Sequence, residues 1–125
     1  MKTEFPIEIS TQPDESEWIR ACEELSKQSH IPWILLSASV GFETYLRQAI
    51  IAAKAGASGV AVGRAVWKEA AVLSGQKRNT FLNGEALMRM RRISEIVEDV
   101  AVPWTNIYQS VPVGEEWFKT YPDHS

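Results

Sequence analysis

Two short, mainly apolar runs stand out in the hydrophobic pattern. They cover residues 33–36 and 57–62, and each is too short for an ordinary helix. Runs of this kind are typical of parallel strands that are covered on both faces. A weaker signal covers residues 3–9, where apolar residues fall on alternate positions despite Pro6. The pattern therefore predicts three strands.

A helical periodicity follows each predicted strand. In the first helix, which opens after Asp14, apolar residues recur at spacings of three and four, and acidic residues occupy the first turn. A second helix is expected over residues 42–55 and a third over residues 65–73. A polar break at residues 74–79 then precedes a last helix over residues 84–100. The residues of this last helix that should face the core are Leu87, Met90, Ile93, Val97 and Val100.

The alternation of strands and helices predicts right-handed parallel βαβ units. Such units belong either to an open doubly wound sheet or to part of a (β/α)₈ barrel. Three strands are too few for either, because a parallel sheet normally has both faces covered and both edges protected. We therefore expect an α/β domain in residues 1–100 that is incomplete on its own and needs something else to complete it.

Residues 101–125 have no helical period and form a separate arm. Its aromatic residues and prolines are Pro103, Trp104, Tyr108, Pro112, Trp117, Phe118, Tyr121 and Pro122. An arm with so many large apolar side chains is expected to lie against the outer helices or against a neighbouring subunit of an oligomer.

Composition narrows the classes of partner. Apolar residues make up 45% and charged residues 23% of the chain, as in ordinary globular proteins. The net charge of −3 and the mixed distribution of charges argue against a nucleic-acid partner. No apolar run approaches the ~20 residues of a membrane helix, and nothing resembles a signal peptide, so we expect a cytoplasmic protein without a membrane partner.

Cys22 should be a buried, unreactive thiol, and His30 and His124 have no ligand at metal-binding spacing, so no metal is expected.

Two turns of small residues follow the second and third predicted strands. The first contains Ser37, Ala38 and Ser39, whose size lets backbone N–H groups approach an anion. The second contains Gly63 and Arg64, and the arginine stands at a helix start, where the helix dipole disfavours a cation unless an anion binds. Adjacent turns of this kind suit a phosphate site. Alternatively, the first turn is only a tight loop and Arg64 pairs with a surface carboxylate.

Lys2 is a candidate nucleophile at the start of the chain. Alternation places it on the same side of the first strand as Glu4, a side that faces the lumen if the strand belongs to a barrel. A partly desolvated lysine amine can attack a carbonyl and form a Schiff base, a mechanism that needs no metal or organic cofactor. The alternative is a solvated, frayed side chain.

Four segments carry a family resemblance: residues 1–6 (MKTEFP), 36–40 (LSASV), 52–59 (AAKAGASG) and 62–67 (VGRAVW). They resemble the C-terminal part of the class I tagatose-1,6-bisphosphate aldolase family, and sulfofructose-phosphate aldolases of the same group look equally similar. The match covers about residues 1–100, with the motifs in the family's order. It implies that these residues correspond to strands six to eight of a TIM barrel, with their helices.

The resemblance also implies site residues. They are Lys2 as the Schiff-base lysine and, in the phosphate-binding turns, Ser37, Ala38, Ser39, Gly63 and Arg64. The family usually has glycine where Ser39 stands, which changes how closely a phosphate can approach. The family's acid–base glutamate belongs to the strands that this sequence does not match, and Glu4 is not an obvious substitute.

The implied function is that of a class I aldolase segment. It would cleave a phosphorylated ketose to dihydroxyacetone phosphate and an aldehyde once a partner chain or self-association completes the barrel. The alternative is a non-catalytic phosphate-binding or assembly module derived from that barrel.

Two residue groups are assigned structural roles. Arg89, Arg91 and Arg92 should form the solvated face of the last helix, with Glu95 as a partner. Among the tryptophans, core packing is expected for Trp18, Trp33 and Trp67.

Overall fold

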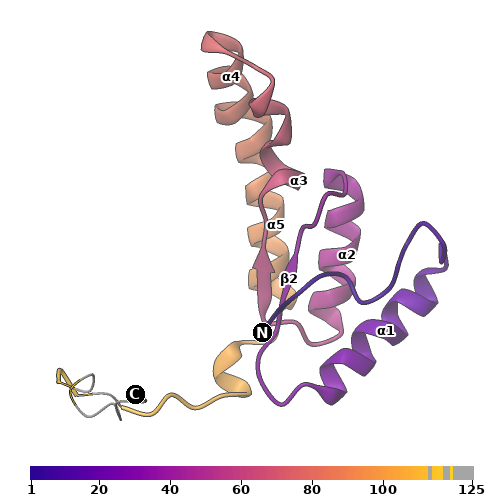
Figure 1. The fold of residues 1–125 in the computed structure, drawn as a ribbon, viewed down its shortest axis with the longest axis vertical. Coiled ribbons are helices and arrows are strands. Elements are labelled where there is room, and N and C mark those ends of the chain that lie inside the picture. Colours follow the sequence, from indigo (N-terminus) through magenta and orange to yellow (C-terminus); the bar gives the residue numbers. More distant parts are fainter. Residues whose placement is uncertain (113, 117–118, 120–125) are drawn as a thin grey trace, which may run out of the picture.

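Three short parallel strands alternate with helices in the computed structural model, which describes residues 1–112, 114–116 and 119 (Figure 1). The strands are β1 (Lys2–Thr3), β2 (Ile34–Leu36) and β3 (Gly59–Ala61), in the order β1-β2-β3. Helices α1 (Glu15–Gln28) and α2 (Phe42–Lys54) connect them. This is the expected α/β arrangement of three parallel strands that alternate with helices in an open sheet.

The chain after β3 is helical over most of its length. A short helix, α3 (Arg64–Trp67), runs into a 3₁₀ turn (Lys68–Ala71). Helix α4 (Gly75–Phe81) then continues through a π-helical turn (Leu82–Ala86) into α5 (Leu87–Val100), and a 3₁₀ turn (Trp104–Asn106) follows. None of the helices in the described ranges has the length and apolar character that a membrane crossing requires.

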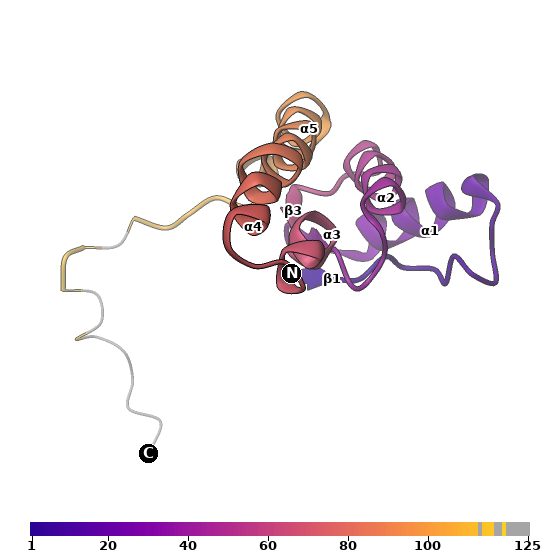
Figure 2. The same ribbon diagram turned by 90° about the horizontal axis from the view of Figure 1, so that it is seen from above.

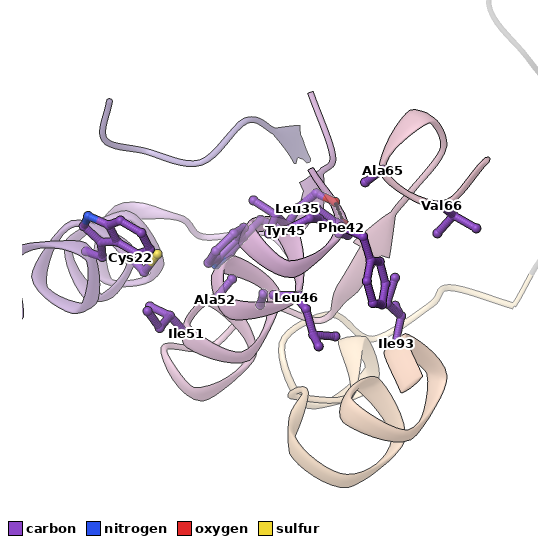
Figure 3. Close-up of a cluster of buried hydrophobic side chains, with 14 of the residues drawn as sticks. Cys22, Leu35, Phe42, Tyr45, Leu46, Ile51, Ala52, Ala65, Val66 and Ile93 are labelled. Atoms are coloured by element: carbon purple, nitrogen blue, oxygen red, sulfur yellow. Dashed lines mark hydrogen bonds between the residues drawn. The ribbon is translucent and has the colours of Figure 1, made fainter. Parts of the chain in front are cut away.

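One face of the sheet carries the core. Helices α1, α2 and α5 all lie on this side of the strands (Figure 2). Leu35 is fully buried there, and its carbonyl accepts a hydrogen bond of 3.1 Å from the Tyr45 hydroxyl. Cys22 and Ile93 extend the same cluster from α1 and α5 (Figure 3). The predicted burial of Cys22 is confirmed, since its exposed fraction is 0%.

The opposite face of the sheet is lined by two rows of residues, because successive side chains of a strand alternate in direction. The strand register places Lys2, Ile34 and Gly59 in one row. Leu36 and Ala61 pair one step closer to the carboxyl ends of the strands. Ile34, Leu36 and Ala61 are only half-buried, so this face is the more open one.

The first strand is shorter than the predicted 3–9. Only Lys2 and Thr3 pair with β2, opposite Ile34 and Leu35. The segment then leaves the sheet before Pro6, which has no N–H to donate. The apolar side predicted from its alternation is nevertheless confirmed, because Phe5 and Ile7 pack against the core.

The expected polar break at residues 74–79 is wrong, because α4 begins at Gly75. The residues of α4 are almost all exposed, so no apolar stripe marks this helix in the sequence. The predicted core face of α5 is also only partly correct. Ile93 is buried and Val97 half-buried, whereas Leu87, Met90 and Val100 are 36–44% exposed.

The arm leaves the body of the protein after α5 (Figure 1). The N–H of Val102 still donates to the Ala57 carbonyl at 3.0 Å. Beyond it, Trp104 and Tyr108 are each 50% exposed. Four aromatic or proline residues of the expected arm, and one histidine, lie outside the described residues: Trp117, Phe118, Tyr121, Pro122 and His124.

Candidate functional site

The turns after β2 and β3 meet in one hollow of about 320 Å³ at the carboxyl ends of the strands. Parallel strands bring the turns that follow them to the same edge of a sheet, which explains the meeting. The residues that line the hollow are Glu4, Leu36, Ser37, Ala38, Ala61, Gly63, Arg64 and Trp67. Four of the six site residues taken from the sequence are therefore neighbours.

Ser37 connects the two turns. Its side chain is buried, and its hydroxyl oxygen accepts a hydrogen bond of 3.2 Å from the Gly63 N–H. Its own N–H donates to the Ala61 carbonyl at 3.3 Å, which continues the pairing of β2 with β3. Because the oxygen serves as an acceptor for Gly63, the hydroxyl hydrogen is directed elsewhere and is available for an anion.

The turn after β2 is held in an uncommon backbone conformation. Ala38 has a φ of +40°, in the left-handed region that costs a residue with a Cβ about 1–2 kcal/mol. Strain of this kind persists where the surrounding structure fixes it, often at binding sites. Ser39, which stands where the aldolase family usually has glycine, is exposed and does not line the hollow.

Arg64 supplies the cation of the hollow. It is exposed at the first position of α3, and within the described ranges its side chain forms no ion pair or hydrogen bond. Glu4 lines the same hollow and brings a carboxylate to it. The hollow thus combines one cation, one carboxylate and the backbone of two turns of small residues.

Lys2 does not line this hollow. It borders a second, wider one of about 540 Å³ near the amino ends of the strands, together with Ile31, Trp104 and Tyr108. The strand register nevertheless puts Lys2 on the same sheet face as Leu36, one row lower. Two residues along a strand span about 6.6 Å, a distance that an extended lysine side chain can cover.

Four residues of the hollow were not among the predicted site residues: Leu36 and Ala61 of the strands, and Glu4 and Trp67. Alternation predicts that Glu4 lies on the same side of the strand as Lys2, and this pattern is the signal that could have assigned Glu4 to the hollow. Trp67 was expected in the core, but it is 46% exposed, and its ring lies against the backbone of Gly63. A Cβ on Gly63 would lie 3.6 Å from that ring, which is ordinary contact distance.

Comparison with known proteins identifies relatives of the chain. No family model matches it. It is 32% identical over 120 residues to tagatose 1,6-diphosphate aldolase 1 of Streptococcus pyogenes serotypes M3, M1 and M18. The match covers 84% of this chain but only 37% of each relative, so the chain spans less than half the length of the curated relatives that it matches. The chain is homologous to a segment of tagatose 1,6-diphosphate aldolase.

Proposed function

We propose that the chain forms the last three strand–helix units of a (β/α)₈-barrel class I aldolase, and that the completed barrel cleaves a phosphorylated ketose. The observation that carries this proposal is the meeting of Ser37, Ala38, Gly63 and Arg64 in one hollow at the carboxyl ends of parallel strands. Active sites of such barrels lie at this end, often with phosphate in the last two turns. The homology to tagatose 1,6-diphosphate aldolase supports the same substrate class.

The phosphate of the substrate binds between the two turns. The guanidinium of Arg64 supplies the charge, and the Ser37 hydroxyl and backbone N–H groups supply hydrogen bonds to the phosphate oxygens. The link between the Ser37 oxygen and the Gly63 N–H fixes the spacing of the turns before the anion arrives. The site therefore needs little rearrangement on binding.

Lys2 is the proposed nucleophile. Its unprotonated amine attacks the ketone carbon of the substrate, water leaves, and a protonated imine forms. A base removes the proton of the hydroxyl group on the carbon to be released, the C–C bond breaks, and its electron pair passes to the imine to form an enamine. The aldehyde leaves, the enamine carbon takes up a proton, and water hydrolyses the imine to free dihydroxyacetone phosphate and Lys2.

The base and the remaining strands come from outside the matched segment. The open face of the sheet, with Ile34 and Leu36 half-buried, has the character of an interior surface that needs further strands to cover it. We propose that a partner chain, or self-association, supplies these strands together with the acid–base carboxylate.

Borohydride trapping tests the role of Lys2. The chain is co-expressed with the part of the Streptococcus pyogenes aldolase outside the matched segment, incubated with dihydroxyacetone phosphate and reduced. Reduction fixes the imine as a stable amine, so mass spectrometry should find the adduct on Lys2. Lys2→Arg should abolish the adduct, and Lys54→Arg on α2 should leave it unchanged. The absence of any adduct on Lys2 in the assembled protein would remove the catalytic proposal.

A second candidate is a non-catalytic phosphate-binding or assembly module. The observation in its favour is the position of Lys2, which borders the hollow near the amino ends of the strands and not the one that holds Arg64. This candidate predicts phosphate binding at Arg64 without any borohydride adduct, so the same experiment, combined with a phosphate titration, separates the two.

A further inference from the structure

Arg89 of α5 is a mostly buried cation that makes several polar contacts. Its side chain is only 13% exposed. Its Nη1 atom donates to both carboxylate oxygens of Glu69 at 3.0 Å and to the Val66 carbonyl at 3.0 Å, and its Nε donates to Glu85 at 3.1 Å. The predicted solvated role with Glu95 as partner is therefore wrong for Arg89.

The guanidinium of Arg89 also lies between two aromatic rings. It is 5.2 Å from the ring centre of Phe42, on α2, and 5.6 Å from that of Phe81, on α4. Partial burial by itself raises the pKa of the Glu69 carboxyl, but hydrogen bonds from its own backbone and from Arg89 outweigh it and lower that pKa. Arg92, by contrast, pairs with Glu43 at the surface, with 45% of its side chain exposed.

These contacts hold helix α3, which begins at the turn formed by Gly63 and Arg64. Helix α3 has only four residues, too few for a helix to be stable without tertiary contacts. Gly63 and Arg64 stand at its start, and Val66, whose carbonyl Arg89 holds, lies two residues after Arg64. Glu69, in the following 3₁₀ turn, is held by the same guanidinium.

We infer that Arg89 is a positioning residue that holds α3 so that the Gly63–Arg64 turn faces the anion. The inference rests on the proposed phosphate site, because it assigns Arg89 a role through Arg64 and no contact with the ligand itself. The planar guanidinium fork is essential to it. A lysine at this position keeps the charge but cannot bond Glu69, Glu85 and a carbonyl in the same geometry.

A double-mutant cycle with inorganic phosphate as the probe tests this inference on the full chain. The dissociation constant is measured by NMR titration for the wild type, Arg89→Lys, Arg64→Gln and the double variant. Arg89→Lys and Arg64→Gln should each weaken binding roughly tenfold, and the double variant should be no weaker than Arg64→Gln. Arg91→Gln, an exposed neighbour on the same helix, is the control and should bind as the wild type does.

Two outcomes overturn the inference. One is a double variant whose loss equals the product of the two single losses, because Arg89 would then act independently of Arg64. The other is an Arg89→Lys protein whose Gly63 and Arg64 amide chemical shifts equal those of the wild type. The shifts are recorded without phosphate, so they test the effect of Arg89 on the turn independently of phosphate binding. A wild-type protein that binds no phosphate would refute the proposed function and not this effect.

Discussion

At the scale of single residues, the hollow contains one group that opposes an anion. The Glu4 carboxylate lines it together with Arg64, and its negative charge would oppose an anion at the proposed site. Substitution of Glu4 therefore tests how its charge affects anion binding in the hollow.

Glu4→Gln should strengthen the binding of inorganic phosphate about threefold to tenfold, because it removes a like charge a few ångströms from the ligand while keeping the shape of the side chain. Isothermal titration at low ionic strength measures the change, and added salt should reduce it. Glu24→Gln, on the exposed side of α1, is the matched control. Equal affinities for wild type and Glu4→Gln would show that Glu4 does not face the bound anion.

Cys22 gives a prediction about alkaline pH. Burial raises the pKa of its thiol to about 12 from an ordinary value of 9.0, so the unfolded chain releases this proton at lower pH than the folded one. The unfolded state then binds fewer protons, and the free energy of unfolding falls as pH rises from about 9 towards 12. Burial also raises the pKa of Tyr45, which adds to the loss.

Cys22→Ala should make that decline shallower by up to about 1.4 kcal/mol per pH unit, measured by urea unfolding between pH 8 and pH 11. Below pH 8 the two proteins should keep a constant difference in stability, because the thiol is protonated in both states. Parallel curves up to pH 11 would mean that the thiol ionises equally in the folded and unfolded chains.

The site residues show which positions a sequence can predict. Ser37 and Gly63 were placed together because each ends a parallel strand, and their hydrogen bond shows them to be neighbours. Alternation predicts one side of the first strand for Lys2 and Glu4, but it does not predict the level of Lys2 along the sheet, since period two carries no information on register between strands. The left-handed conformation of Ala38 was not predictable either, because alanine rarely adopts it.

At the scale of elements, strands and amphipathic helices were predictable where a core forms, and α4 was not. Its polar residues lack an apolar stripe because the helix extends beyond the sheet (Figure 1). Local bonds hold its start instead. The Nε atom of Arg78 donates to the carbonyls of Ala70 and Leu73, at 3.1 and 2.8 Å, and so ties α4 to the preceding 3₁₀ turn.

Gly84→Ala should stabilise this long helical segment. Gly84 lies in the π-helical turn, and a Cβ there would meet no atom within 4 Å. Alanine restricts the unfolded chain and should raise the free energy of unfolding by about 0.5–1 kcal/mol, as measured by urea titration. Gly75→Ala is the matched opposite, because Gly75 has a φ of +50°, and it should lower the stability. A loss of stability in Gly84→Ala would indicate that the π-helical turn itself requires glycine.

At the scale of the whole molecule, the amino ends of the strands present an apolar surface. The hollow there is bordered by Met1, Ile31, Trp104 and Tyr108, and each of these four side chains is about half exposed. Two of them belong to the arm, which was expected to contact either outer helices or a neighbouring subunit. Apolar side chains gathered in this way favour the subunit, since a large exposed patch usually marks an interface.

A chain that ends at Val102 tests this expectation while keeping the hydrogen bond from Val102 to the Ala57 carbonyl. The number of chains per particle, obtained by multi-angle light scattering, should fall relative to that of the full chain, because the surface formed by Trp104 and Tyr108 is removed. The full chain with Trp104→Ser and Tyr108→Ser should show the same fall in the number of chains per particle, which separates the side chains from the length of the arm. If both proteins keep the wild-type number of chains per particle, the arm has no part in assembly.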